Sequence, residues 1–417
     1  MPHLVMKFGG TSVADLDRIR NAAQKVKREV ENGYSVTVIV SAMSGKTNEL
    51  VGWVRDAAGG AGAATPGFYD AREYDAVVAS GELVTSGLMA IVLQEMGIQA
   101  RSWQGWQVPV KTTAAHGAAR IEDIGTENLN AKFADGMEVA VVAGFQGVSP
   151  EGRVTTLGRG GSDTTAVAFA AALKAERCDI YTDVDGVYTT DPRITKKARK
   201  LNKIAYEEML ELASLGAKVL QTRSVELAMR YKVRLQVLSS FSDEPGTLVC
   251  DEEEVMEDNA VAGVAYSRDE AKVSLISVAD RPGVAAAIFG PLADAGINVD
   301  MIVQNISEDG RTDMTFSCPV DELPRAKKAI EDAKNSGSIN YHGLETDTDV
   351  AKVSIVGIGM RSHAGIAQKM FKALADDNIN IKVITTSEIK VSVLVDRKYM
   401  ELAVQSLHDA FELDKAS

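Results

Sequence analysis

The N-terminal part of the chain alternates short, β-rich runs with longer, amphipathic stretches of helix length. Strands that are apolar throughout are buried on both faces, which is typical of a parallel sheet covered by helices. The pattern therefore predicts an α/β fold, with a mainly parallel sheet, helices on both faces and ligands at the carboxyl ends of the strands. The predicted strands are Leu4–Phe8, Val36–Val40, Val139–Ala143, Asp179–Thr182 and Leu235–Leu238. The predicted helices are Ala14–Glu31, Leu83–Met96, Thr164–Ala175 and Ala217–Arg230.

The C-terminal part contains an internal repeat. Ala271–Ile276 recurs as Ala351–Val356, and Leu292–Val299 recurs as Leu374–Ile381. Two matches in the same order favour a duplicated module. Each copy predicts the order strand, helix, strand, strand, helix, so a final strand would make it a βαββαβ (ferredoxin-like) module.

The second copy lacks that final strand within its own stretch of chain. Ile339–Leu344 can complete the first module, but the second module ends with its helix near Leu413. The unassigned run Val261–Tyr266 aligns with Tyr341–Thr346 at the offset of the repeat. We therefore predict that Val261–Tyr266 is lent to the second module as its missing strand.

A polar, acidic and turn-rich segment separates the two parts, which is typical of a domain boundary. The predicted organisation is a first domain at 1–245, an acidic linker at 246–259, a first module at 260–346 and a second module at 347–417.

Composition and charge narrow the function classes. Hydrophobic residues make up 45% and charged residues 25% of the 417 residues, which is typical of a globular chain and excludes a disordered or disulfide-rich one. The net charge is -13, which argues against a protein that binds a nucleic acid backbone. Residues 1–250 carry 28 basic and 29 acidic residues, against 17 and 29 in residues 251–417. This asymmetry favours two parts with different partners.

Neither targeting nor metal binding is indicated. The N-terminus reaches glycine too soon for a signal peptide, and no run approaches the length of a membrane span, so we expect a cytoplasmic protein without a membrane partner. The cysteines are odd in number and widely spaced, which argues against disulfides and a thiolate zinc site; they are Cys178, Cys250 and Cys318. The histidines never fall at metal-ligand spacing and are expected at the surface or in satisfied positions; they are His3, His116, His342, His363 and His408.

A glycine-rich segment follows the first predicted strand. In Lys7-Phe-Gly-Gly-Thr-Ser-Val, the glycines allow backbone N–H groups to approach a phosphate, the next helix adds positive potential and Lys7 adds a full charge. Taken alone, this segment fits equally a turn in which Thr11 or Ser12 caps the helix.

Two other segments resemble nucleotide-binding fingerprints without matching them. Gly45-Lys46-Thr47 lacks the first glycine of a P-loop, because Val40 stands there. Gly158-Arg-Gly-Gly-Ser-Asp has Asp163 at the third glycine position of a dinucleotide fingerprint, which disfavours a Rossmann dehydrogenase.

The segment Gly158–Asp163 is better explained by anion binding. Arg159 can bind a carboxylate through two hydrogen bonds, and Gly160 and Gly161 permit close backbone approach. A simple helix cap by Ser162 or Asp163 would need neither the arginine nor the glycines. Further on, the polar run Tyr181–Arg193 fits a loop that faces a nucleotide, or an ordinary turn-rich connection.

Five motifs in order, together with the repeat, resemble the aspartokinase family across essentially the whole chain. They are Lys7-Phe-Gly-Gly-Thr-Ser-Val, Ser41-Ala-Met-Ser-Gly-Lys-Thr-Asn, Gly158-Arg-Gly-Gly-Ser-Asp-Thr-Thr-Ala, Thr182-Asp-Val-Asp-Gly-Val-Tyr-Thr-Thr-Asp-Pro-Arg and Gly216-Ala-Lys-Val-Leu. The resemblance implies an amino-acid-kinase fold followed by two ACT modules. The implied reaction is phosphorylation of the side-chain carboxylate of L-aspartate by ATP with Mg²⁺, the first step toward lysine, threonine, methionine and diaminopimelate.

The resemblance also implies roles for individual residues. The implied catalytic residues are Lys7, Asp163 and Lys218. The implied ATP-binding residues are Lys7, Phe8, Gly9, Gly10, Thr182, Asp183, Tyr188, Arg193, Lys218 and Val219. The implied aspartate-binding residues are Ser41, Thr47, Glu82, Arg159 and Ser162. No protein ligand is implied for the metal, because Mg²⁺ is usually held by substrate phosphates and water.

For the C-terminal modules, the resemblance implies feedback inhibition by lysine, threonine or both. The implied effector ligands are Asp280, Asn298, Asp300 and Gln304. The second module has Ser362-His-Ala-Gly at the corresponding turn and lacks the aspartate and proline, so ordinary turn chemistry is favoured there. ACT modules commonly associate, which implies a homo-oligomer or an assembly with a shorter regulatory subunit that starts at Met256.

Two other functions stay open. One is a kinase for glutamate or N-acetylglutamate, against which the segments around Ser41 and Arg159 argue. The other is a non-catalytic amino-acid sensor, which would have no reason to keep Lys7, Asp163 and Lys218 together.

Overall fold

A computed structural model describes residues 1–59, 69–215, 219–255, 260–306 and 310–415. The chain forms two compact units. The first consists of Met1–Val187, Lys200–Ser214 and Lys218–Val255. The second consists of Tyr188–Arg199, Leu215–Ala217 and Met256–Ser417.

In its described residues, the first unit is built around an eight-stranded sheet with the strand order β10-β12-β11-β9-β1-β2-β6-β3. The central strands are parallel, whereas β12 runs antiparallel to β11. The predicted α/β fold with a mainly parallel sheet is confirmed. The strands are β1 (His3–Phe8), β2 (Ser35–Val40), β3 (Ala100–Trp103), β6 (Val139–Ala143), β9 (Arg177–Thr182), β10 (Lys203–Ala205), β11 (Leu235–Ser239) and β12 (Thr247–Cys250).

Helices cover both faces of this sheet. Leu4, Met6 and Phe8 pack with α1 and α4 in one core, and α6 packs against β1, β2 and β9 on the side to which Lys7 points. Helix α6 is apolar and buried around most of its circumference, as a helix between other elements must be. The helices are α1 (Leu16–Glu31), α2 (Lys46–Ala57), α3 (Ala71–Val78), α4 (Ser80–Glu95), α5 (Glu127–Ala134), α6 (Gly161–Ala172), α7 (Tyr206–Ser214) and α8 (Thr222–Tyr231).

A smaller sheet in the same unit has the strand order β5-β4-β7-β8. Its last strand packs against α3 and leads directly into the glycine-rich segment that begins at Gly158. The strands are β4 (Val110–Thr112), β5 (Ile121–Ile124), β7 (Gln146–Val148) and β8 (Val154–Thr156).

Local chemistry explains where the helices differ from the predicted ranges. Asp15 caps α1 by accepting a hydrogen bond from the backbone N–H of Arg18, so the helix begins at Leu16 and not at Ala14. Helix α6 begins at Gly161, earlier than predicted, because Gly160 turns the chain with a φ of 74°. In the last predicted helix, the described residues are helical only from Thr222.

Residues Ala71–Glu95 are long and apolar enough to cross a membrane, which the sequence analysis did not anticipate. This stretch is two helices, α3 and α4, and half of its most apolar window is buried. Both helices also bury a carboxylate, Asp75 in α3 and Glu82 in α4.

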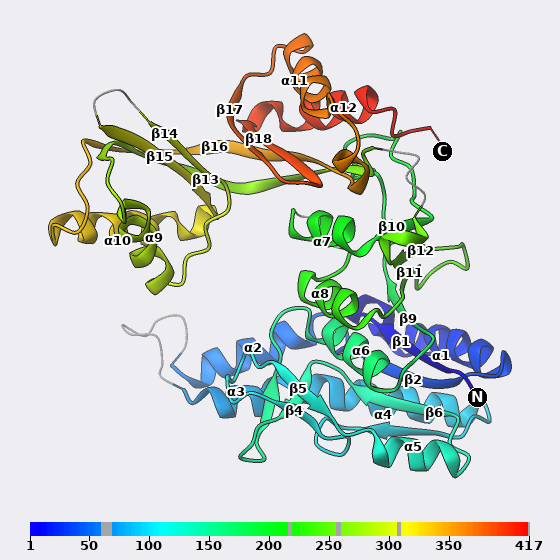
Figure 1. The fold of residues 1–417 in the computed structure, drawn as a ribbon. Helices are drawn as coiled ribbons and strands as arrows, with labels where there is room; N and C mark the ends of the chain where they lie inside the picture. The colour runs from blue at the N-terminus through cyan, green and yellow to red at the C-terminus, as the bar shows by residue number, and fades with distance from the viewer. Residues whose placement is uncertain (60–68, 216–218, 256–259, 307–309, 416–417) are drawn as a thin grey trace. The chain divides into compact units, whose positions relative to one another are not determined.

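The second unit contains a six-stranded antiparallel sheet with the order β14-β15-β13-β16-β18-β17 in its described residues. Helices α9 and α10 lie beside one end of the sheet, and α11 and α12 beside the other (Figure 1). The strands are β13 (Gly263–Ala279), β14 (Ile302–Ile306), β15 (Arg311–Cys318), β16 (Gly343–Val356), β17 (Ile381–Thr386) and β18 (Lys390–Asp396). The helices are α9 (Val284–Asp294), α10 (Leu323–Asn335), α11 (Ile366–Asp376) and α12 (Met400–Ala410).

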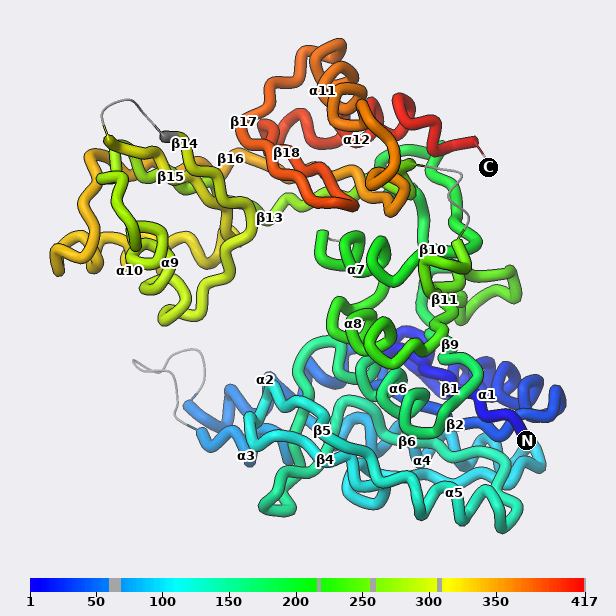
Figure 2. Tube along the Cα trace, viewed as in Figure 1, coloured from blue at the N-terminus to red at the C-terminus, as the bar shows by residue number. Residues whose placement is uncertain are grey.

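Two long strands, β13 and β16, run through both modules, as the trace in Figure 2 shows. Residues 271–279 of β13 pair with β15 of the first module. Residues 263–267 of the same strand pair with 352–356 of β16, in the second module. Val261 and Val264 accordingly belong to the core of the second module.

The segment Tyr188–Arg199 packs with the second unit, although the sequence places it in the first domain. The backbone N–H of Val264 donates to the carbonyl oxygen of Thr189 at 2.8 Å, and the hydroxyl of Thr189 lies 2.9 Å from Nε2 of His408. The phenol of Tyr266 donates to Asp191 at 2.8 Å. These contacts join residues far apart in the chain, which a reading of local pattern does not detect.

Candidate functional site

A nearly buried ion pair lies at the carboxyl end of the central strand. Nζ of Lys7, at the end of β1, is 2.5 Å from Oδ1 of Asp163, in the first turn of α6. Each side chain is only 11% exposed. The pair holds a lysine ammonium at the sheet edge where ligands bind in parallel α/β folds.

The turn after β1 brings neighbouring strand ends close together. The backbone N–H of Gly9 donates to the carbonyl oxygen of Tyr181, at the end of β9 (3.3 Å). A Cβ atom on Gly10 would lie 3.0 Å from the carbonyl oxygen of Ala42. The hydroxyl of Ser240 donates to that of Ser12 at 2.6 Å, although the sequence analysis treated Ser12 only as a cap and missed Ser240.

The segment from Gly158 to Ser162 turns tightly into α6. Gly158 and Gly160 have φ values of 75° and 74°, and a Cβ atom on Gly160 would lie 2.2 Å from Cγ of Gln221. Glycine is therefore required at position 160, because other residues rarely adopt this φ and because a Cβ atom would overlap the side chain of Gln221. Ser162 is buried, whereas Arg159 is exposed and its side chain makes no hydrogen bond or ion pair with the residues that the structure describes. The guanidinium is available to an anionic ligand.

Glu82 supplies a buried carboxylate to the same region of the first unit. Its Oε1 accepts a hydrogen bond from the backbone N–H of Ala42 at 3.0 Å. Its Oε2 has no hydrogen-bond partner among the described residues. Burial raises the pKa of Glu82 to about 7, against the opposing effect of hydrogen bonds from backbone N–H groups. A buried carboxylate oxygen without a partner is suited to a cationic ligand.

Two further candidates flank the turn after β2. The backbone N–H of Ser41 donates to the carbonyl oxygen of Phe8 at 3.1 Å, which ties this turn to the end of β1. Thr47 lies in the first turn of α2, which follows Gly45 in a left-handed conformation. Both residues are partly buried.

The nucleotide-binding candidates divide between the two units. Thr182 ends β9, and its hydroxyl donates to Asp183 at 3.1 Å. Tyr188 and Arg193 belong to the second unit, where the guanidinium of Arg193 pairs with Asp191 at 2.8 Å. Val219 belongs to the first unit, and Lys218 lies outside the described residues.

The effector candidates Asp280, Asn298, Asp300 and Gln304 are all exposed. No hydrogen bond joins any two of them in the described parts of the second unit. The carboxylate of Asp300 pairs with Nζ of Lys352, which also pairs with Glu270 at 2.7 Å. Asp300 is thus already paired with a nearly buried lysine of the second module.

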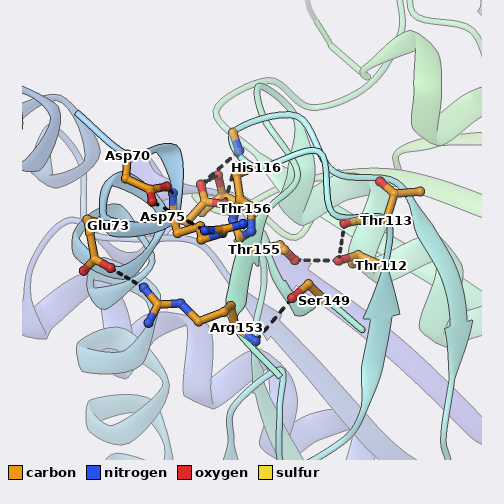
Figure 3. Close-up of polar contacts among 12 residues, drawn as sticks. Asp70, Glu73, Asp75, Thr112, Thr113, His116, Ser149, Arg153, Thr155 and Thr156 are labelled. Carbon is orange, nitrogen blue, oxygen red and sulfur yellow. Dashed lines mark hydrogen bonds and ion pairs between the residues drawn. The ribbon is translucent and has the colours of Figure 1, made fainter. Parts of the chain in front are cut away.

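A polar network centred on Asp75, drawn in Figure 3, was not predicted from the sequence. Asp75 lies in α3 and is fully buried, and it contacts His116 and Thr156. The expectation that His116 is a satisfied histidine agrees with this contact. Arg72, Glu73 and Asp75 stand close together in the chain, so the sequence contained no signal that Asp75 alone is buried, and it could not indicate the partners of Asp75.

Comparisons with known proteins cover the whole chain. A model of the amino acid kinase family matches residues 3–239, and two ACT domain models match residues 273–335 and 353–411. An aspartate kinase of Pseudomonas fluorescens is 53% identical over 416 residues, covering 99% of this chain and 98% of that protein. An aspartokinase of Helicobacter pylori is 48% identical over 417 residues, covering 99% and 100%. The structure of E. coli aspartokinase III in complex with aspartate and ADP is similar with a TM-score of 0.79 and 28% identity, covering 98% of this chain and 99% of that one.

Proposed function

This chain belongs to the amino acid kinase family, and within it to the aspartate kinases, so we propose that the carboxyl edge of its eight-stranded sheet is where ATP phosphorylates the side chain of L-aspartate. The observation that carries this placement is the buried pair of Lys7 and Asp163 in the unit that also buries Glu82, whose Oε2 has no hydrogen-bond partner among the described residues. The ammonium of Lys7 suits the phosphates of ATP, and the carboxylate of Glu82 suits the ammonium group of aspartate.

The chemistry requires no general base. The nucleophile is a carboxylate with a pKa of about 4, which is already ionised at neutral pH. The barrier is the approach of an anion to a polyanion, and positioned cations and backbone dipoles lower it. The role of the site is therefore to neutralise charge and to orient both substrates.

The phosphates of ATP bind at the end of β1 in this proposal. Lys7 and the backbone of Phe8, Gly9 and Gly10 hold the transferring phosphoryl group, with Lys218 on its other side. Asp163 orients the lysines, which its ion pair with Lys7 supports. Thr182, Asp183 and Val219, which belong to the first unit, are proposed to hold the rest of ATP.

Aspartate is held by the two charged groups on its α-carbon. The free guanidinium of Arg159 binds the α-carboxylate through two hydrogen bonds, and Oε2 of Glu82 accepts from the ammonium. Ser41, Thr47 and Ser162 complete this site. Fixing the α-carboxylate and the ammonium decides which carboxylate faces the phosphate.

Mg²⁺ is proposed to arrive with ATP. Mg²⁺ is usually held mainly by substrate phosphate oxygens and water. When bound, the ion supplies further charge neutralisation, and we assign it no protein ligand.

An ADP-release assay with different acceptors tests the proposed reaction. The purified full-length chain should release ADP with L-aspartate and Mg·ATP, and should release much less with glutamate, with N-acetylglutamate or without an acceptor. Equal release with glutamate would indicate a different amino-acid kinase. Binding of an amino acid without any ADP release would indicate a sensor.

The second unit is proposed to carry feedback regulation in the cytoplasm. Two ACT domains imply allosteric control, and E. coli aspartokinase III has been solved in complex with lysine and aspartate, with a TM-score of 0.76 to this chain and 28% identity. Lysine, threonine or both are the proposed effectors, bound by Asp280, Asn298, Asp300 and Gln304. Adding each effector to the ADP-release assay identifies the inhibitor.

The ACT modules are also proposed to associate between subunits. Their association would give a homo-oligomer or an assembly with a shorter subunit that starts at Met256, which lies outside the described residues.

A further inference from the structure

Asp75 is fully buried and accepts several hydrogen bonds from two separate segments of the first unit (Figure 3). Its Oδ2 lies 2.7 Å from Nδ1 of His116, and its Oδ1 accepts from the hydroxyl of Thr156 at 2.5 Å. The backbone N–H of Gly117 donates to both carboxylate oxygens, at 3.0 and 3.2 Å. The carboxylate thus fixes a turn at 116–117 and the end of β8 against α3.

No lysine or arginine forms an ion pair with Asp75 among the residues that the structure describes. A buried carboxylate without such a partner is costly unless its oxygens accept enough hydrogen bonds. Here His116, Gly117 and Thr156 provide them. A leucine in α3 would fill the same space without this cost, so Asp75 is better explained by the geometry that it imposes than by packing.

The two segments that Asp75 holds lead into the proposed aspartate site. The backbone N–H of Ala119 donates to the carbonyl oxygen of Thr156 at 2.9 Å. Arg223 joins the segments again by donating to the carbonyl oxygens of Leu157 (3.0 Å) and Ala119 (2.9 Å). A Cβ atom on Gly158 would lie 3.2 Å from the carbonyl oxygen of Gly117. The turn that carries Arg159 therefore begins beside residues whose positions Asp75 fixes.

The same aspartate is also linked to Glu82. Helix α3, which carries Asp75, meets α4 at Ala79, and Glu82 lies in the first turn of α4. Gln146, which ends the turn after β6, donates to the carbonyl oxygen of Ala79 at 3.2 Å. Asp75 thus connects the segment that carries Arg159 to helices α3 and α4, the second of which carries Glu82.

We propose that Asp75, through His116 and Thr156, is a positioning residue that sets the separation of Arg159 and Glu82 and so the affinity for aspartate. This inference rests on the proposed roles of Arg159 and Glu82 in binding the α-carboxylate and the ammonium of aspartate. Asp75 itself touches neither substrate. Its effect is expected in the KM for aspartate and not in the KM for ATP, because the phosphate-binding residues lie on β1 and the following turn.

Two pairs of variants test the network in the full-length protein. Thr156→Val removes the hydroxyl that donates to Asp75, whereas Thr156→Ser keeps it. His116→Ala removes the ring, whereas His116→Asn keeps a donor near the position of Nδ1. We expect Thr156→Val, His116→Ala and Asp75→Asn each to raise the KM for aspartate about tenfold or more, with the KM for ATP changed less than about twofold. Thr156→Ser and His116→Asn should keep the KM for aspartate close to that of the unsubstituted protein.

Glu73→Gln is the matched control. Glu73 lies on the same helix, and its exposed carboxylate pairs with Arg153 at the surface. This variant should leave both KM values unchanged. Equal increases in the KM for aspartate and for ATP, or a lower melting temperature with an unchanged KM for aspartate, would overturn the positioning role. If Asp75→Asn does not fold, the KM values of Thr156→Val and Thr156→Ser test the positioning role by the same criteria.

Glu82→Gln, measured in parallel, separates this inference from the proposed function. If Glu82→Gln raises the KM for aspartate and the Asp75, His116 and Thr156 variants do not, only the positioning role fails. If Glu82→Gln also leaves that KM unchanged, the proposed aspartate site itself is wrong.

Discussion

Lys7→Ala is expected to lower kcat about 10³-fold or more, because it removes a preorganised cation from the proposed path of the phosphoryl group. The ammonium of Lys7 is held 2.5 Å from Asp163 at the end of β1, with each side chain only 11% exposed. Such a cation needs no reorganisation when charge shifts in the transition state. The measurement is steady-state ADP release with saturating aspartate and Mg·ATP.

Removal of Lys7 also leaves Asp163 without its partner, which by itself destabilises the fold by a few kcal/mol. The double variant Lys7→Ala with Asp163→Asn distinguishes the two effects. It should regain part of the melting temperature lost in Lys7→Ala without regaining turnover. Lys27→Ala is a control, since Lys27 lies on α1 with its side chain 38% exposed and pairs with Glu31 at 3.8 Å. Near-normal turnover of Lys7→Ala would refute the assignment.

Binding of aspartate is expected to weaken as the pH falls through about 7. Burial raises the pKa of Glu82 to about 7, so below that pH the carboxyl of the free enzyme is protonated. Only the ionised form pairs with the substrate ammonium, and kcat/KM for aspartate should therefore fall with decreasing pH. Glu82→Gln should remove this inflection and raise the KM for aspartate about 10- to 100-fold at pH 8. The measurement is the pH profile of kcat/KM for both proteins.

The raised pKa also predicts the sign of a stability change. The folded apo form binds a proton at Glu82 more tightly than the unfolded chain does, so its stability falls as pH rises from the ordinary glutamate range to about 7. Glu82→Gln should therefore raise the melting temperature at pH 8 in the absence of aspartate. Glu95 is an exposed position on the same helix, so Glu95→Gln should change neither the pH profile of kcat/KM nor the melting temperature. A pH profile that Glu82→Gln leaves unaltered would argue against the proposed role.

Features that depend on local pattern were predicted from the sequence. The β-rich run Leu4–Phe8 became β1, and the repeat became two modules that match ACT domain models. Arg159 stood out in a glycine-rich motif, whereas Glu82 was implied only by the resemblance to the aspartokinase family. Each of these signals lies within a few neighbouring residues, where burial and turn chemistry leave a direct mark on sequence.

Features that depend on distant contacts were not predicted. Asp75 meets His116 and Thr156 across 41 and 81 residues, and neither partner lies in a recognisable motif. The segment Tyr188–Arg199 was placed with the first domain, but Thr189 contacts His408 across 219 residues. Such pairs are set by how the elements pack, which a single sequence does not display.

A crystal structure of the full-length protein with L-aspartate and Mg·ADP would reveal how aspartate is oriented in the site. We expect its α-carboxylate on the guanidinium of Arg159, its ammonium on Oε2 of Glu82 and its side-chain carboxylate directed toward the phosphates at Lys7. Aspartate bound in the reverse orientation, or away from Arg159 and Glu82, would refute the proposed site.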